Sequence, residues 1–189
     1  MADLLLLARS DVGRVVQRKP TDLALEAIDA AAELGPMSAT HELILDVQPA
    51  VVEGSRDELD RVAINLIENA IRHTPPGTTI WVSSALAGAH ATLIVEDNGP
   101  GIPGELGGSV FERFVRGAGD GGGSFGLGLA IVRAVIEAHG GSVALERTHR
   151  DGAEHGARFV VTLPAASAPS TNGALDAQPV AASDLHDDG

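Results

Sequence analysis

Hydrophobic residues recur with a helical period in four segments of the chain and with a strand-like pattern in several shorter ones. The period predicts helices at about 3–18, 21–34, 56–73 and 128–139. Strand-like runs lie at 42–47, 51–52, 79–86, 91–96, 142–146 and 158–163. Helices are mixed with consecutive strand pairs, which predicts an α+β sandwich with a mixed sheet and helices on one face.

Proline and capping residues set the expected helix ends. Pro20 ends the first helical segment, because proline breaks a helix interior. Thr21 or Asp22 can cap the second helix. Ser55 followed by Glu58 forms a capping-box pattern that opens the long third helix.

Two segments depart from this periodic pattern. Residues 97–128 contain twelve of the 23 glycines, and a connection of this length is usually functional or disordered. Residues 165–189 are rich in Ala, Ser, Pro and Asp, have no period and contain no Lys or Arg, which predicts a disordered acidic tail. We therefore expect one globular unit at 21–164, preceded by a short segment, 1–20.

Composition and charge exclude several functions. Hydrophobic residues make up 44% of the chain and aromatic residues 3%, so the core is expected to be aliphatic. Lys and Arg total 13 against 26 Asp and Glu, a net charge of -13 that disfavours nucleic acid and anionic membranes as partners. The absence of cysteine excludes a disulfide scaffold and a thiolate zinc site. No stretch approaches the ~18 apolar residues of a membrane span, so we expect no membrane insertion and a cytoplasmic location.

The long helix carries the first candidate site. Asn65, Asn69, Arg72 and His73 share one helix face. Two carboxamides one turn apart offer oxygen ligands to a hard cation such as Mg²⁺, and Arg72 can face a phosphate. Taken alone, an exposed polar helix face explains this pattern equally well.

A second pattern follows a strand, at Asp97, Gly99 and Gly101. The glycines allow close approach of a ligand, and a carboxylate accepts hydrogen bonds from an amine such as that of adenine. A simple Asp-Asn-Gly turn is the alternative explanation.

Two further patterns lie in the glycine-rich segment. Phe111 and Phe114 can anchor a mobile loop, although a short amphipathic turn is equally consistent with them. The glycines of 121–128 lead directly into a helix N-terminus, which attracts phosphate. No Lys follows them as in a P-loop, and no strand precedes them as in a dinucleotide-binding fingerprint.

In this order, the four patterns resemble the ATP-binding catalytic domain of sensor histidine kinases. That domain is a member of the Bergerat-fold (GHKL) ATPases, with the gyrase B subunit, MutL, heat-shock chaperone ATPases and anti-sigma-factor serine kinases. The resemblance covers about 21–164, with the N box at 65–73, the glycine boxes at 97–101 and 126–129, and the F box at 111–116. It implies a two-layer α/β sandwich, a mostly antiparallel mixed sheet and a glycine-rich lid at 101–125 over ATP.

The resemblance also implies roles for individual residues. Asn69 would bind Mg²⁺, Asp97 the adenine amine, and Arg116 the γ-phosphate, with Asn65 and Arg116 as the catalytic candidates. The implied ATP site comprises Asn65, Asn69, Arg72, His73, Asp97, Gly99, Gly101, Ile102, Arg116, Gly126, Leu127, Gly128 and Leu129.

Asn65 distinguishes between subfamilies. Hydrolytic members and serine kinases carry a Glu there as general base, and Asn cannot accept a proton. Glu68 points about 100° away from Asn69 on a helix, so we do not expect it to substitute. Asn65 therefore favours phosphoryl transfer to His, which is nucleophilic when neutral. The alternatives are a Bergerat-fold serine kinase or anti-sigma-type regulator, and an interaction module without transfer.

The phosphoacceptor histidine is expected elsewhere. His41-Glu42 leads into a strand pattern and is not followed by the Leu-Arg-Thr-Pro of a dimerisation hairpin. Residues 1–20 resemble the end of that hairpin's second helix. We therefore expect a monomeric ATP-binding domain or subunit of a two-component kinase. It would phosphorylate a His on a separate domain or chain, with a response regulator downstream.

Overall fold

The computed structural model describes residues 17–102, 109–112, 127–148 and 156–166. Its elements follow the chain in the order β1 (Lys19–Asp22), α2 (Leu23–Leu34), β2 (Glu42–Val47), β3 (Val51–Gly54), α3 (Arg56–His73), β4 (Thr79–Ala87), β5 (His90–Asp97), α4 (Gly128–Ala138), β6 (Ser142–Arg147) and β7 (Ala157–Pro164). Apart from β1, each lies where the hydrophobic pattern predicts it, with ends that differ by at most two residues. The helix expected at 3–18 lies almost entirely outside the described residues.

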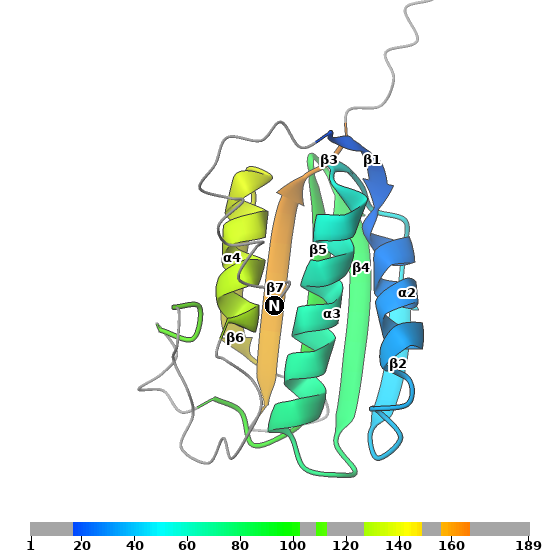
Figure 1. The fold of residues 1–189 in the computed structure, drawn as a ribbon, viewed down its shortest axis with the longest axis vertical. Helices are drawn as coiled ribbons and strands as arrows, with labels where there is room; N and C mark the ends of the chain where they lie inside the picture. The colour runs from blue at the N-terminus through cyan, green and yellow to red at the C-terminus, as the bar shows by residue number, and fades with distance from the viewer. Residues whose placement is uncertain (1–16, 103–108, 113–126, 149–155, 167–189) are drawn as a thin grey trace, which may run out of the picture.

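The strands form a five-stranded sheet in the order β2-β4-β5-β7-β6 and a separate two-stranded sheet of β1 and β3. In the larger sheet β2 pairs with β4 in parallel, and the other neighbours are antiparallel. The described helices α2, α3 and α4 lie on one face of this sheet (Figure 1). The predicted α+β sandwich with a mixed, mostly antiparallel sheet is therefore confirmed.

The core lies between the helices and the sheet and is aliphatic, as the composition predicts. Helix α3 packs between α2 and α4, so its buried face contributes most from the helical layer (Figure 1). Its buried residues are Leu59, Val62, Ala63, Leu66, Ile67, Ala70 and Ile71. Phe159 on β7 is the largest fully buried side chain among the described residues.

Strand β1 is an element that the sequence did not predict. It runs antiparallel to β3, with Thr21 opposite Val52, and it crosses the boundary expected at residue 20. Pro20 signalled only a helix end, yet proline is compatible with an edge strand, where its missing N–H interrupts no ladder. On the other edge of β3, Ala165 forms a bridge to Val52, so ordered chain continues past residue 164.

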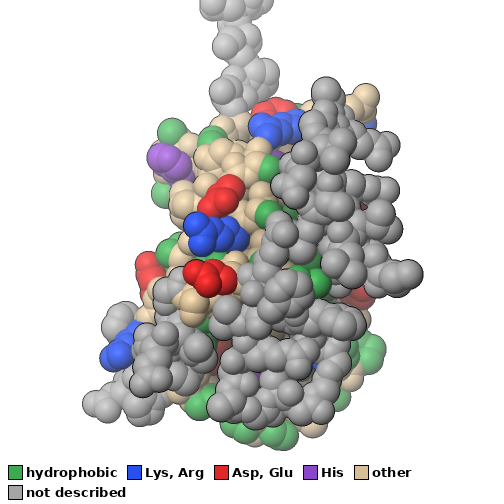
Figure 2. Space-filling view, turned by 60° about the vertical axis from the view of Figure 1, so that its left-hand side comes forward, with side chains coloured by type: hydrophobic (Ala, Val, Ile, Leu, Met, Phe, Trp, Pro, Cys, Tyr) green, Lys and Arg blue, Asp and Glu red, His purple; other side chains and the backbone are tan. Residues whose placement is uncertain are grey.

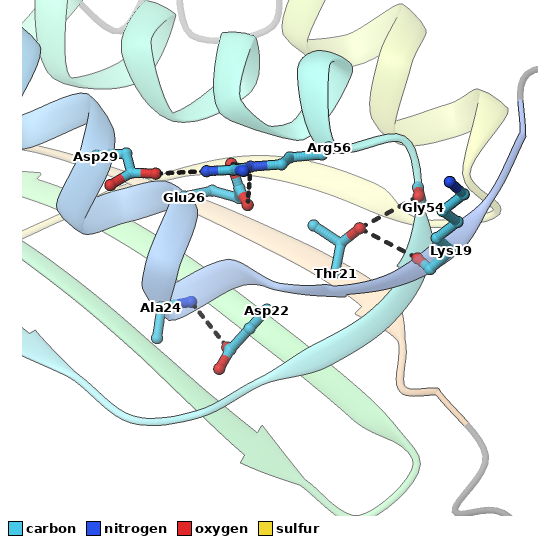
Figure 3. Close-up of polar contacts among 8 residues, drawn as sticks. All are labelled: Lys19, Thr21, Asp22, Ala24, Glu26, Asp29, Gly54 and Arg56. Carbon is cyan, nitrogen blue, oxygen red and sulfur yellow. Dashed lines mark hydrogen bonds and ion pairs between the residues drawn. The ribbon is translucent and has the colours of Figure 1, made fainter.

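The helix caps agree with prediction in position and differ in chemistry. Asp22 is the N-cap of α2, and its Oδ1 accepts from Ala24 N at 3.0 Å (Figure 3) and Ala50 N at 2.8 Å. Ser55 is the N-cap of α3, as expected, but its side chain makes no capping hydrogen bond, so the predicted capping box is wrong. Its backbone N–H instead donates to His139 Nε2.

An ionic contact joins α2 to α3. Arg56 donates to Asp29 at 2.7 Å and pairs with Glu26 at 3.2 Å (Figure 3). Burial raises the pKa of Glu26, and the charge of Arg56 opposes that rise. The pair therefore offsets part of the cost of burying this carboxylate between two helices.

Charges of both signs lie together on part of the surface. On the face shown in Figure 2, Asp and Glu side chains lie beside Lys and Arg among the described residues. Ion pairs such as Arg133–Glu137, at 2.8 Å, are part of this mixture. Within the described ranges, no helix combines the length and apolarity of a membrane span.

Candidate functional site

Asn65 and Asn69 lie one turn apart on α3, away from the face that packs on the sheet, and both are half-buried. The Nδ2 atom of Asn65 is buried and has no hydrogen-bond partner within the part of the chain that the structure describes. A buried amide donor without a partner is costly, so its presence indicates a place for an acceptor from a ligand. The amide oxygens at these positions are also suitable ligands for a hard cation.

The start of α4 lies directly against Asn65. A Cβ at Gly128 would be 3.2 Å from Asn65 Oδ1, so glycine permits this close approach. Leu127, the N-cap, makes no side-chain capping bond, and the first turn contains no acidic residue. The first N–H groups of α4 therefore form an anion-binding end next to Asn65. Leu127 is buried, and the half-buried Leu129 packs against the core, so their contribution to a ligand is through the backbone.

Asp97 ends β5 on the core-facing side of the sheet. Its side chain accepts at Oδ1 from Gly99 N at 2.9 Å and from Ala157 N at 3.3 Å. Burial raises the pKa of Asp97, while these two hydrogen bonds lower it and the charge of Glu96 raises it. Both bonds end on Oδ1, so neither of them occupies Oδ2.

Glu96, the neighbour of Asp97 on β5, lies on the other face of the sheet, where an arginine neutralises its charge. Glu96 is 1% exposed, accepts from Thr148 Oγ1 and pairs with Arg158 at 2.8 Å. Arg158 in turn lies 3.3 Å from Glu146. Arg158 therefore reduces the repulsion that Glu96 exerts on Asp97.

The backbone after Asp97 passes close to β7. Gly101 has a φ of +73°, and a Cβ there would lie 3.1 Å from the backbone of Gly156. Ile102 is half-buried against the core, and Phe111 packs edge-on against Phe159 with ring centroids 6.1 Å apart. Phe111 thus packs on a core residue, while Phe114, the other expected anchor, lies outside the described residues.

Two residues at the end of α3 that were expected to face the nucleotide make no hydrogen bond or ion pair with the other site residues described above. Arg72 pairs with Glu68 at 2.7 Å, and both side chains are partly exposed. His73 is exposed as the last residue of α3. The described contact of Glu68 is thus with Arg72, one turn further along the helix.

His41 forms part of the support of the site. Thr74 donates its hydroxyl to Ala70 O at 2.7 Å and so accepts from His41 Nε2 at 3.0 Å. The methyl group of Thr74 packs beneath Gly99, where a Cβ would lie 2.6 Å away. Both ring nitrogens of His41 have partners, because Nδ1 lies 3.1 Å from Thr40 Oγ1. These contacts hold the His41 ring against the end of α3.

We expect Gly99→Ala to lower the free energy of unfolding by about 1–3 kcal/mol, a typical cost of over-packing. The added methyl group would collide with Thr74 Cγ2 and lie 2.9 Å from Asp97 Oδ1. Thr74→Ser removes the colliding methyl group and keeps the hydroxyl. In a double-mutant cycle of urea melts, the two changes should therefore couple favourably. Additive losses would show that Thr74 does not confine this turn.

Comparison with known proteins identifies the family. Residues 54–167 match the family described as Histidine kinase-, DNA gyrase B-, and HSP90-like ATPase. The chain belongs to this ATPase family. The resemblance carried by the four motifs is thereby confirmed, and ATP binding follows from membership.

Similar members are sensor histidine kinases. The probable sensor histidine kinase TcrY of Mycobacterium tuberculosis is 44% identical over 76% of this chain and 31% of its own length. The histidine-protein kinase/phosphatase MprB of the same species is 39% identical over 89% of this chain and 34% of its own. This ATPase domain thus spans about a third of those relatives.

Solved structures of sensor histidine kinases also align with this chain. A structure of the mycobacterial sensor histidine kinase MprB aligns with a TM-score of 0.72 at 31% identity, covering 78% of this chain and 98% of that one. The ATP-binding domain of PrrB from Mycobacterium tuberculosis aligns at 0.65 with 27% identity, covering 80% and 99%.

The structure brings two pairs of the predicted site residues into contact. Asn65 adjoins Gly128, and Asp97 adjoins Gly99. Arg116 and Gly126 lie outside the described residues. Sequence reasoning missed the contributions of Thr74 and Ala157, since the latter reaches Asp97 from 60 residues away in the chain.

Proposed function

We propose that this ATPase domain transfers the γ-phosphoryl group of ATP to a histidine on a separate domain or chain. The carrying observation is the half-buried amide of Asn65 beside the N-terminus of α4. A general base for water or a serine hydroxyl would be required there for hydrolysis or serine phosphorylation. An amide cannot take that proton, whereas neutral imidazole attacks phosphorus without such help.

The described residues support distinct parts of ATP binding. Asp97 Oδ2 would accept the adenine amine, in a turn shaped by Gly99 and Gly101. The N–H groups at the start of α4 and Asn65 Nδ2 would donate to the triphosphate. The adenine and the triphosphate are thus held by different elements, which orients the γ-phosphate for in-line attack.

The donor set also fits Mg²⁺. Asn69, with Asn65 beside it, offers neutral oxygen ligands, and Mg²⁺ usually takes few ligands from protein and the rest from phosphates and water. When bound, the ion would neutralise charge on the transferring phosphoryl group. Asn69 would hold it, while Arg72, His73 and Arg116 remain proposed contacts to the nucleotide.

The reaction balances without a further co-reactant. An imidazole nitrogen of the acceptor forms a bond to the γ-phosphorus, and the bond to the bridging β–γ oxygen breaks. ADP leaves, and the acceptor imidazole loses its N–H proton to solvent. The domain itself orients the nucleotide and stabilises the developing charge.

The remaining assignments follow from the similarity to sensor kinases. We infer a cytoplasmic site of action, a His-containing dimerisation domain as the direct partner and a response regulator downstream. We likewise propose that the domain acts as a monomer and that the expected division into 1–20, 21–164 and 165–189 shifts at both boundaries, since β1 begins at Lys19 and Ala165 pairs with Val52. All but the shifted boundaries rest on family membership and on the relatives' names.

A phosphotransfer assay tests the proposal. The chain is incubated with γ-labelled ATP and Mg²⁺, alone and with a His-containing hairpin protein from the same genome. We expect label on the added protein only, lost in acid and stable in base, as for phosphohistidine. Acid-stable label would instead establish the serine-kinase alternative. Hydrolysis at a rate independent of the hairpin protein would contradict phosphotransfer.

A further inference from the structure

Two of the contacts between the α3 and α4 segments lie at opposite ends of α4. At one point Ser55, the N-cap of α3, contacts His139, the C-cap of α4. At the other, Asn65 of α3 contacts Gly128, the first residue of α4. Asn65 lies ten residues after Ser55, and Gly128 eleven residues before His139. At a rise of about 1.5 Å per residue, the two intervals are about 15 and 16.5 Å, so the helices run antiparallel with these two contacts in register.

Hydrogen bonding fixes the protonation state of the His139 ring. The backbone N–H of Ser55 can only donate, so Nε2, at 3.1 Å, is an acceptor. The ring proton therefore resides on Nδ1, which donates to Val135 O at 2.8 Å. His139 is 6% exposed and uses both nitrogens as a neutral imidazole, one toward each helix.

The ring is also confined by packing. A Cβ at Gly54 would lie 3.1 Å from His139 Cδ2 and 2.5 Å from Leu59 Cδ1. The end of β3 thus packs directly against the imidazole. If α4 slid along α3, the hydrogen bond from Ser55 to His139 would break. The contact therefore determines the axial position of α4.

We propose that His139 is a positioning residue for the triphosphate of ATP. It fixes α4 along α3 and thereby sets the distance between the N–H groups at the start of α4 and Asn65. The proposal rests on the proposed role of these two elements in binding phosphate. Because Asp97 holds adenine from β5, loss of the register affects the phosphates and leaves the adenine contact intact.

Two isosteric variants separate the two hydrogen bonds. In His139→Gln, the amide oxygen can occupy the place of Nε2 and accept from Ser55. In His139→Asn, the amide nitrogen can occupy the place of Nδ1 and donate to Val135, but nothing accepts from Ser55. Both variants lose the ring, so a general packing loss is common to them.

The measurement is the ratio of ATP affinity to adenosine affinity, from titrations of the whole chain with Mg²⁺ present. We expect His139→Asn to lower the ratio by about tenfold and His139→Gln by less than about twofold, the scale of one hydrogen bond. Equal ratios in the two variants, or equal weakening of ATP and adenosine, would overturn the proposal. Failure of the unaltered chain to bind ATP would refute the proposed function instead.

Nitrogen-15 spectra of the unaltered chain keep the test independent of how the variants fold. We expect His139 at neutral pH to be in the Nδ1–H tautomer. The Nε2–H tautomer would be incompatible with the bond from Ser55 and would overturn the proposal.

Discussion

Replacing Asn69 with alanine is expected to reduce Mg²⁺-dependent phosphoryl transfer by roughly 10²- to 10³-fold, the usual effect of deleting one electrostatic contact to a transition state. The side chain is half-buried on α3 and lies outside the buried face of the helix. Its removal should therefore change the free energy of unfolding by less than about 1 kcal/mol. Transfer to a hairpin substrate at a series of Mg²⁺ concentrations measures the effect.

Asn69→Asp is the matched variant for that experiment. It keeps an oxygen ligand at the same place, so it should retain measurable transfer and shift the Mg²⁺ dependence. Asp57→Ala, at the exposed first turn of the same helix, serves as a control far from the site. Transfer at the normal rate by Asn69→Ala would show that the ion is held elsewhere.

Replacing Asp97 with asparagine is expected to weaken ATP and ADP alike by about 10- to 100-fold, the cost of a lost hydrogen bond to a charged group. The amide oxygen can still accept from Gly99 and Ala157. The amide nitrogen, however, would present a donor to the adenine amine. Titrations with ATP, ADP and GTP measure the change, and the preference for adenine over guanine should fall.

Asp97→Ala separates binding from folding. It should weaken the nucleotides similarly and also lower the free energy of unfolding by about 1–3 kcal/mol, since two buried N–H groups lose their acceptor. Burial raises the pKa of Asp97, so the affinity of the unaltered chain should decline on acidification earlier than an ordinary aspartate would permit. A loss confined to ATP, with ADP unaffected, would contradict the adenine assignment.

The local patterns of the sequence predicted local structure well. The apolar stripe of α3 and the alternation in β5 placed Asn65 and Asp97 on elements that the structure confirms. Helix starts were also correct at Asp22 and Ser55. These features depend on residues close in the chain, where spacing alone determines which side chains share a face.

Contacts between distant residues could not be predicted in this way. The capping box failed because Ser55 uses its backbone N–H for His139, 84 residues away, and its side chain makes no cap. Strand β1 was missed because Pro20 was interpreted as a helix breaker before its partner β3 was known. The hydrogen bond from Ala157 to Asp97 was missed for the same reason, since no local pattern indicates which distant backbone a turn will contact.

The two-stranded sheet of β1 and β3, at the top of Figure 1, is where the described chain both enters and leaves the domain. Val52 of β3 is paired with Thr21 and also with Ala165, so the incoming and outgoing chain run along opposite edges of one strand. Both flanks therefore reach the domain at this strand, close to the end of α4 where Arg18 donates to Ala138 O. A load on the preceding segment would thus act on α4 as well as on the two-stranded sheet.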